Sequence, residues 1–343
     1  MPLFSRRHLL TTGSAFAATT LISRVSAQET ATPVASPVAG GLQPDGTWRF
    51  TDDRGIVVEA DALPTRVIAQ TTAAAALWDF GIRPVGIFGP SRLADGTPDL
   101  QAGNLDLDTV EVLGDYGAFD LEKAIALQAD LYVDVDRGNG QLWYVPADLE
   151  AQLLERFPTI DIIAANVPVT TTIEHFEALA TALGADQSAP AVADAKSAWQ
   201  TAEAGFKDAL AAKPGLKMLA VSTGDNQAYV WNPPVLGDLR YYQSLGATFV
   251  VPENPSESTL FNSEIMSWEQ FGTYGMQADL ILVDQREDLS LYADIDIWNS
   301  MPAVRAGQVG TWYGVFPFSY KGLGDTLNRM IEQVEKADPG LVS

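Results

Sequence analysis

The sequence of 343 residues contains no cysteine and only two histidines, His8 and His175. Without cysteine there are no disulfide bonds, thiolate metal sites, cysteine nucleophiles or lipid attachment through an N-terminal cysteine. A protein site for zinc or manganese would need several histidines together with carboxylates. We therefore expect no metal ion held directly by side chains and no resident cofactor.

Basic residues are also scarce, since 21 Lys and Arg stand against 44 Asp and Glu, giving a net charge of −23. The first 27 residues contain three of the arginines and no acid, so the remaining 18 basic and 44 acidic residues give −26. Such an acidic chain has no general attraction for nucleic acid or anionic membranes. We expect no nucleic-acid partner.

Catalytic motifs are missing as well. The sequence has no G-x-S-x-G, no phosphate-binding P-loop and no G-x-G-x-x-G. His175, the only histidine beyond the N-terminal segment, is predicted to be a plain surface or helix-packing residue, and Asp52 and Asp53 to lie solvated in a turn. We therefore expect no catalytic residues and a binding protein; an exported α/β hydrolase-like enzyme is the alternative.

The N-terminal segment has the features of an export signal. Ser5–Leu10 (SRRHLL) resembles the twin-arginine motif, an apolar run extends to Ile22, and Val25-Ser26-Ala27 offers a cleavage site. This run is too short and too polar to span a membrane well. We predict a twin-arginine-type signal peptide over residues 1–27, a periplasmic or other extracytoplasmic location, and a disordered linker over 28–45, which is rich in Pro, Ala, Thr and Gly.

The next part of the sequence alternates strand and helix patterns. Residues 48–59 predict a hairpin, and β-rich runs then alternate with helical runs up to Ala164. The expected strands are 66–70, 84–88, 110–113, 131–135 and 160–164, and the expected helices 72–80, 121–127 and 147–156. This alternation predicts an N-terminal α/β lobe over residues 46–170 with a parallel sheet.

One long helix is predicted in the middle of the chain, over residues 190–213. Its apolar residues recur at intervals of three and four from Val192 to Leu210, and Pro214-Gly215 ends it. With a preceding helix at 171–183, it forms a connecting segment over residues 171–213. At 1.5 Å per residue the long helix extends roughly 35 Å.

The strand and helix alternation returns after Pro214 and predicts a C-terminal α/β lobe over residues 214–343. Its expected strands are 217–222, 248–251, 280–284 and 308–312, and its expected helices 236–245, 268–274 and 322–336. The predicted fold class is therefore α/β, with two Rossmann-like lobes joined by a single long α-helix and a ligand cleft between the lobes.

Two segments match across the predicted lobes. Asp120–Leu131 (DLEKAIALQADL) and Ser267–Leu280 (SWEQFGTYGMQADL) each begin a helix, carry a glutamate in its first turn and lead through Ala-Asp-Leu into a strand. An acid in a first turn is favoured by the helix dipole, which explains each glutamate without any function. The doubled placement of Glu122 and Glu269 suggests a shared role.

The order of these segments resembles the class III, or helical-backbone, substrate-binding proteins of ABC importers, which capture ferric siderophores, haem and cobalamin. The resemblance runs from about Trp48 to Lys336. It departs from the family at Gln128-Ala129-Asp130, where a proline often precedes the aspartate, and in lacking the lipid-anchoring cysteine. The latter leaves open how the protein is retained at the cell surface. The segments that carry the resemblance are the hairpin, residues 63–69, 77–86 and 120–131, the long helix, and residues 267–284 and 298–309.

The resemblance implies a function and partners. The protein is expected to be the extracytoplasmic solute-binding component of an ABC importer, which captures a ferric siderophore or similar iron chelate and delivers it to a permease dimer. Glu122 and Glu269 match the family's permease-contact glutamates. We expect a monomer. Haem or cobalamin binding by the same fold remains an alternative, as does a surface or sensor protein that passes its ligand to a receptor.

Ligands of open α/β sheets bind beyond the carboxyl ends of the strands. The loops that follow the predicted strands are rich in arginine, tyrosine and tryptophan, which suit a bulky, oxygen-rich chelate. Four candidate arginines favour an anionic ferric chelate. The candidate ligand-binding residues are Arg92, Tyr116, Arg137, Trp143, Tyr144, Tyr229, Trp231, Arg240, Arg286, Trp312 and Tyr313.

Overall fold

The computed structural model describes residues 40–224, 227–256 and 262–342. The predicted signal peptide lies outside the described residues, and so does the predicted linker up to residue 39. Among the helices of the described ranges, none combines the length and apolar character needed to cross a membrane.

A small antiparallel sheet opens the described chain. It consists of β1 (Gly41–Leu42), β2 (Trp48–Thr51) and β3 (Val57–Ala60), so the predicted hairpin is confirmed. The prediction of disorder up to residue 45 is wrong for its last part, because Gly41 and Leu42 pair with Arg49 and Trp48. An edge strand needs only backbone partners, which composition does not reveal.

The turn of this hairpin corrects a second prediction. Asp52 and Asp53 are not solvated, because the turn packs against the neighbouring sheet. Asp52 is 1% exposed and accepts a bond from Arg54, while Asp53 lies 2.8 Å from the Nδ1 of His175. His175 is thus a buried packing histidine with a carboxylate partner.

The N-terminal lobe contains a parallel sheet of β4 (Val67–Gln70), β5 (Gly86–Phe88), β6 (Glu111–Val112), β7 (Leu131–Asp136) and β8 (Thr159–Ile163). Its spatial order is β6-β5-β4-β7-β8. The chain therefore builds outward from β4 in one direction and then in the other. The switch point lies between β4 and β7, where ligands of such sheets bind.

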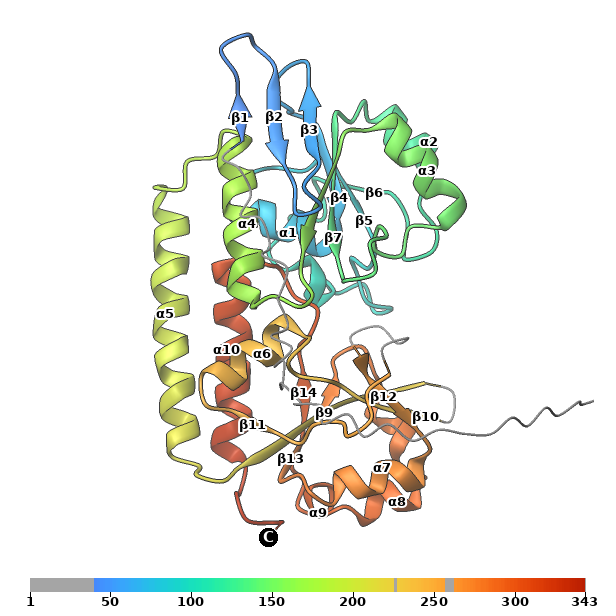
Figure 1. Ribbon diagram of the computed structural model, residues 1–343, viewed down its shortest axis with the longest axis vertical. Helices are drawn as coiled ribbons and strands as arrows, with labels where there is room; N and C mark the ends of the chain where they lie inside the picture. The colour runs from blue at the N-terminus through green and yellow to red at the C-terminus, as the bar shows by residue number, and fades with distance from the viewer. Residues whose placement is uncertain (1–39, 225–226, 257–261, 343) are drawn as a thin grey trace, which may run out of the picture. The chain divides into compact units, whose positions relative to one another are not determined.

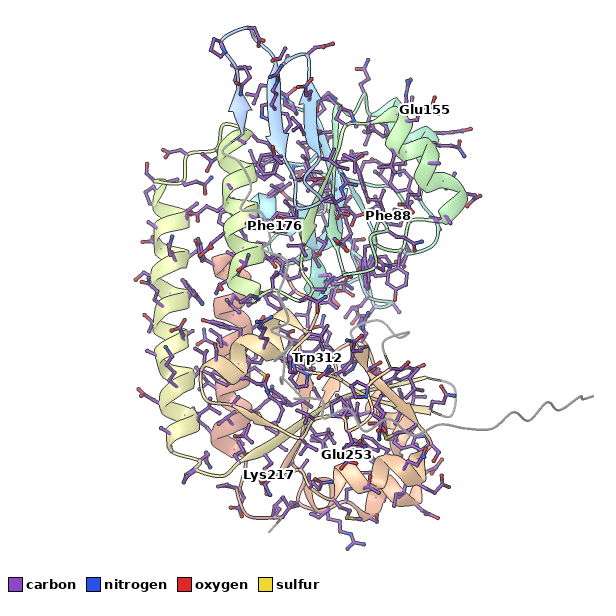
Figure 2. All side chains as sticks on the ribbon, viewed as in Figure 1. Phe88, Glu155, Phe176, Lys217, Glu253 and Trp312 are labelled. Carbon is purple, nitrogen blue, oxygen red and sulfur yellow. The ribbon has the colours of Figure 1, made fainter. Side chains whose placement is uncertain are left out.

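Helices cover both faces of this sheet, as the near-continuous apolar strands require. The helices are α1 (Thr71–Asp79), α2 (Leu121–Ala126), α3 (Ala147–Arg156) and α4 (Val169–Ala182). On one face, α1 and α4 pack against Val133 and Val135, and on the other α2 and α3 pack around Tyr132. Phe176 and Phe88, labelled in Figure 2, belong to these two opposite cores.

The C-terminal lobe has a mixed sheet, in the order β12-β10-β9-β13-β14 with β11 also paired to β9. Its strands are β9 (Lys217–Gly224), β10 (Gln227–Val230), β11 (Thr248–Phe249), β12 (Glu264–Met266), β13 (Leu280–Asp284) and β14 (Val309–Trp312). Strands β9, β11, β13 and β14 are parallel, as the sequence predicted. The switch point of this sheet lies between β9 and β13.

One part of this lobe differs from the prediction. Residues 223–231, which follow a predicted strand, were expected to form a cleft loop, but β9 continues to Gly224 and β10 returns antiparallel beside it. The predicted helix over residues 236–245 is confirmed as α6 (Gly237–Ser244), so Arg240, Tyr241 and Tyr242 lie on a helix and not in a loop of the cleft. Both tyrosines are buried, because the apolar side of α6 faces the core.

The remaining helices of the lobe lie at its outer side. They are α7 (Trp268–Gly275), α8 (Asp296–Ser300) and α9 (Pro302–Arg305), and they pack on the face of the sheet formed by Ile281 and Val283. The sequence predicted α7 but neither α8 nor α9. Helices this short show less than two turns of apolar periodicity, so the pattern does not reveal them.

The long connecting helix is confirmed as α5 (Pro190–Ala211), and α10 (Tyr320–Lys336) lies beside it (Figure 1). The predicted apolar stripe is buried at Val192, Ala202, Phe206 and Ala209. One continuous hydrophobic cluster includes these residues, the α1 and α4 side of the N-terminal sheet, and Leu280 and Leu282 of β13. Both lobes therefore share one core.

Candidate functional site

Each lobe places an arginine just beyond the switch point of its sheet. Arg137 directly follows β7, and Arg286 follows β13 by two residues. The two guanidinium groups are close enough for Arg286 to lower the pKa of Arg137, and both influence the pKa of Tyr116. The carboxyl ends of the two sheets therefore lie near each other, and they form the candidate site.

Arg137 is a buried cation with unused hydrogen-bond donors. It is 6% exposed, and its Nε and Nη2 have no hydrogen-bond partner among the described residues. Its guanidinium lies over the rings of Trp143, at 5.2 Å, and Phe318, at 5.1 Å. Burial lowers its pKa, while Tyr116, Asp238 and Asp134 act in the opposite direction. An unpartnered buried guanidinium is costly, so the arrangement is suited to an oxygen-rich ligand.

Arg286 is held differently. Its side chain is partly exposed and forms a two-pronged bond to Asp284, from Nε to Oδ1 at 2.8 Å and from Nη2 to Oδ2 at 2.6 Å. Burial opposes its charge, but the bond to Asp284 outweighs burial and raises the pKa of Arg286. Its positive charge is therefore largely compensated within its own lobe.

Tyr116 connects the polar groups of the N-terminal side. Its hydroxyl accepts bonds from Gln70 Nε2 at 2.9 Å and Trp143 Nε1 at 3.1 Å, and donates to Gln101 Oε1 at 2.6 Å. Burial raises its pKa to about 12. The ring of Tyr144 lies 4.5 Å from that of Tyr116, and Tyr144 is 49% exposed. These aromatic side chains form a wall beside Arg137.

A second aromatic group lies on the C-terminal lobe. The rings of Trp231 and Trp312 are 5.5 Å apart, and Tyr229 stacks on Trp231 at 6.3 Å. Trp312 is buried at the end of β14, on the side of the lobe nearer the N-terminal lobe (Figure 2). Its Nε1 donates to Asp238 Oδ2 at 2.6 Å, which fixes the ring.

Two buried carboxyl groups lie near Arg137. Burial raises the pKa of Asp238 to about 6, although the bond from Trp312 favours its charged form. Burial likewise raises the pKa of Asp134, which accepts bonds from the Tyr132 hydroxyl and the Trp143 backbone N–H. Neither carboxyl accepts a hydrogen bond from Nε or Nη2 of Arg137, so they balance its charge without occupying these donors.

Three candidates from the sequence lie apart from these groups. Arg92 is exposed and bonds Asp108 at 3.0 Å, and Arg240 is exposed and donates to the Asn166 carbonyl at 3.0 Å. Tyr313 lies under Arg329, 5.1 Å from its guanidinium. The other eight candidates belong to the two aromatic groups and the two arginines described above.

Tyr313 and Arg329 also line a cavity of about 190 Å³. The cavity lies between the short helix η1 (Leu100–Ala102), the segment after β14 and α10, so both lobes contribute to it. Gln285, the neighbour of Arg286, forms part of its wall. The wall of this cavity therefore reaches the residue next to Arg286.

Several residues of the site were missed at the sequence level. Phe318, under Arg137, and Asp238, bonded to Trp312, carry no local motif that marks them. Gln70 could have been found, because it is the last residue of β4 and so lies at the switch point. Gln101 lies in a segment for which no regular structure was expected.

Glu122 and Glu269 lie away from this site, on the surface. Both are exposed in the first turn of their helices, α2 and α7, which are capped by Asp120 and Ser267. Their carboxylates make no ion pair within the part of the chain that is described. Each lobe thus presents one glutamate at an equivalent position.

No group of three or more His, Cys, Asp or Glu side chains among the described residues could hold a metal ion. Tyr116, the most central phenol, already uses its hydroxyl for three hydrogen bonds.

Solved structures with the same fold are siderophore-binding proteins. The chain is 35% identical to DesE, a ferric-siderophore receptor from Streptomyces coelicolor, over 85% of this chain and 99% of DesE, with a TM-score of 0.79. FhuD from Vibrio cholerae, solved with Fe³⁺–Desferal, is 17% identical, over 81% and 99% of the two chains, with a TM-score of 0.56. VctP from Vibrio cholerae, a periplasmic catecholate-siderophore binding protein, is 19% identical, over 84% and 99%, with a TM-score of 0.57.

No protein-family model and no curated protein sequence matches the chain. The identity to DesE over nearly its whole length nevertheless establishes kinship, and the two lobes and the connecting helix agree with it. The chain belongs to the class III, helical-backbone substrate-binding proteins, in the group of the periplasmic siderophore-binding proteins.

Proposed function

We propose that this protein is the extracytoplasmic binding component of an ABC importer and captures a ferric siderophore between its two lobes. The observation that carries the proposal is Arg137, a buried guanidinium with two unpartnered donor nitrogens among aromatic rings. Such a donor pair matches the adjacent oxygens of an iron chelate, and the rings match its apolar backbone. DesE, a ferric-siderophore receptor, supports the same reading.

Binding of free iron or of haem is less well supported. No metal-ligating cluster exists among the described residues, so the iron would arrive already chelated. Haem ligation by tyrosine would need an available phenolate, and Tyr116 has a raised pKa and a fully used hydroxyl. An enzymatic role is less well supported, because the two carboxyl groups near Arg137, Asp134 and Asp238, already accept hydrogen bonds from Tyr132, Trp143 and Trp312.

Delivery to a permease rests on the two exposed glutamates. We propose that Glu122 and Glu269 meet basic residues of a permease dimer, one glutamate from each lobe. Replacing both by glutamine should abolish uptake of the iron chelate in cells while leaving its affinity for the purified protein unchanged. Loss of affinity in this double variant would instead assign the glutamates to the ligand site, and unchanged uptake would remove them from the permease contact.

Export by the twin-arginine route, and a monomeric state outside the cytoplasm, belong to the same proposal. Processing after Ala27 is its simplest test. Mass spectrometry of the secreted protein should find Gln28 as the first residue, and replacement of Arg6 and Arg7 by lysine should stop export. A protein still carrying residues 1–27 outside the cell would argue against a cleaved signal peptide.

Tryptophan fluorescence tests the ligand class. Trp143, Trp231 and Trp312 lie in the site, so a strongly absorbing ferric chelate should quench emission saturably. Arg137→Gln should weaken binding by at least about tenfold, because a bond to a charged group contributes about 1.5–3 kcal/mol. Arg83→Gln, which removes an exposed arginine lying over Trp78, is the matched control.

The titration should include haem, cobalamin and a ferric salt. Saturation by a ferric siderophore, but not by the salt, would support the proposal. Saturation by haem or cobalamin alone would assign the protein to another ligand of the same fold. No quenching by any of these compounds would overturn the proposal.

A further inference from the structure

The charges around the site limit the charge of the ligand it takes, an inference that rests on the proposed function. The four arginines from the sequence suggested an anionic chelate, but three of them are engaged. Arg92 bonds Asp108, Arg240 donates to a backbone carbonyl, and Arg286 is paired with Asp284. Among these four, only Arg137 has guanidinium nitrogens that are both buried and without a hydrogen-bond partner in the described residues.

The single open cation is itself partly balanced. Asp238, from the C-terminal lobe, and Asp134, from the N-terminal lobe, both interact electrostatically with Arg137. Both carboxyl groups are buried, at 5% and 0% exposure, so solvent screens them little. Counting Arg137, Arg286, Asp284, Asp238 and Asp134 together, the site carries at most one uncompensated positive charge. The chain as a whole has a net charge of −23, which adds a long-range repulsion of anions.

Ferric chelates differ strongly in charge. Three singly charged hydroxamates neutralise ferric iron, whereas three doubly charged catecholates leave three negative charges. A trianion in this site would find one open guanidinium and two buried carboxyl groups, and burying unpaired charge is strongly unfavourable. A neutral chelate would give Arg137 the oxygen pair it lacks and place its methylene chains on the aromatic walls.

We propose that the cleft selects ferric chelates with a net charge close to zero, the tris-hydroxamate class, and rejects the trianionic tris-catecholates. Fold alone does not decide this, since FhuD was solved with Fe³⁺–Desferal and VctP is a catecholate-siderophore binding protein. The discrimination between the two classes of chelate comes from the pairing of Arg286 with Asp284 and from the two buried carboxyl groups near Arg137.

The test compares two probes on the full mature protein, the ferric complex of Desferal and a ferric tris-catecholate, by fluorescence quenching at low salt. Desferal complex should bind at least about tenfold more tightly. Equal or tighter binding of the tris-catecholate would overturn the inference and leave the proposed function intact. Failure of both ferric chelates to bind would overturn the two together.

A charge variant gives a second readout that a merely structural change would not produce. Asp284→Asn keeps the shape of the side chain but frees the charge of Arg286, so relative affinity for the tris-catecholate should rise by about tenfold. The matched control is Asp52→Asn, which breaks the same kind of buried pair with an arginine two residues later, Arg54, in the hairpin turn. An unchanged preference in Asp284→Asn, or the same change in the control, would contradict the inference.

Discussion

At the scale of single residues, Tyr116 organises the N-terminal wall of the site. Its hydroxyl bonds Gln70, Gln101 and Trp143, which come from three separate segments. Tyr116→Phe would leave those three polar groups without their partner in a mostly buried place. The wall is therefore maintained by one hydroxyl group rather than by many weak contacts.

Tyr116→Phe is expected to lower the free energy of unfolding by about 1–3 kcal/mol, the cost of leaving buried donors or acceptors unsatisfied. Urea denaturation followed by circular dichroism would measure it. Tyr144→Phe is the control, because the 49%-exposed Tyr144 can exchange a lost bond for one to water. Equal effects of the two substitutions would show that the Tyr116 hydroxyl has no special role.

A pair of buried acids makes stability depend on pH. Asp134 and Asp161 are register partners on β7 and β8, and burial, followed by their mutual repulsion, raises the pKa of Asp161. Burial raises the pKa of Asp134 as well, to about 7. In the unfolded chain both carboxyls would titrate near their ordinary value of 3.8. Burial and repulsion raise the pKa of Asp161 to about 9, so the folded protein binds more protons than the unfolded chain between about pH 4 and pH 9.

The contribution of these two groups to stability should therefore be complete below about pH 4, and it should be lost as the pH rises through the raised pKa values of about 7 for Asp134 and about 9 for Asp161. Asp161→Asn is expected to raise the free energy of unfolding at pH 8, with the difference from the original protein vanishing near pH 4. Urea midpoints measured from pH 4 to 9 would show this convergence. A variant that is less stable than the original protein at pH 8 would contradict the assignment of repulsion to this pair.

Single residues also mark the limit of the sequence prediction. The arginines and most aromatic residues of the site were identified because they follow predicted strands, and strand ends are readable from apolar runs. The sequence did not show which arginine lacks a hydrogen-bond partner. Asp284 precedes Arg286 by two residues, but many acid–arginine pairs at this spacing are exposed to solvent and do not bond. The burial of Asp53 against His175 joins residues 122 positions apart, which no local pattern reveals.

At the scale of elements, α10 connects the lobes as much as α5 does. Its N-cap Ser319 accepts a bond from the Gly322 backbone N–H at 3.0 Å and donates to Asp79 of α1 at 2.6 Å. Burial raises the pKa of Asp79, so this carboxylate depends on its hydrogen-bond donors. The cap of α10 is therefore also a link to the N-terminal lobe.

Ser319→Ala is expected to destabilise the protein by about 1–2 kcal/mol through the lost helix cap. It should destabilise the protein further because the buried carboxylate of Asp79 loses a hydrogen-bond donor. Ser267→Ala removes the exposed cap of α7, which makes no link between lobes, and should cost less. Thermal unfolding by calorimetry would compare the two variants. A larger effect of Ser267→Ala would remove Ser319 from its linking role.

Elements were predicted well where they are long or parallel. The helices α3 and α5 and the strands β4, β7 and β13 match their predicted ranges to within one or two residues, because each has several turns or a full run of apolar residues. The antiparallel strands β10 and β12 were missed. These two strands pair with each other although they are far apart in the chain, as Tyr229 and Ile265 show, so their pairing depends on tertiary packing.

At the scale of the whole molecule, one hydrophobic core includes residues of both lobes, of α5 and of α10. These two helices lie side by side (Figure 1). Further bonds cross between the lobes beside it, including Asn166 N–H to the Val235 carbonyl at 2.8 Å. A hinge would have to break these contacts, so ligand binding should shift the lobes only slightly. The connecting helix predicted from the sequence already implied this restraint.

Small-angle X-ray scattering should therefore give the same radius of gyration, within error, with and without a saturating ferric chelate. Closing of the lobes by a wide hinge motion would appear as a clear compaction. That outcome would mean that the contacts of Ser319 and Asn166 open in solution, and that α5 and α10 do not restrain the lobes.

The most direct test of the central claim is to locate the iron in crystals of the protein with a bound ferric chelate, using anomalous diffraction at the iron edge. We predict one iron position between Arg137 and Arg286, with chelate oxygens bonded to the Nε and Nη2 of Arg137. Iron bound outside the space between the lobes, or a chelate that leaves both Arg137 nitrogens without a partner, would contradict the claim.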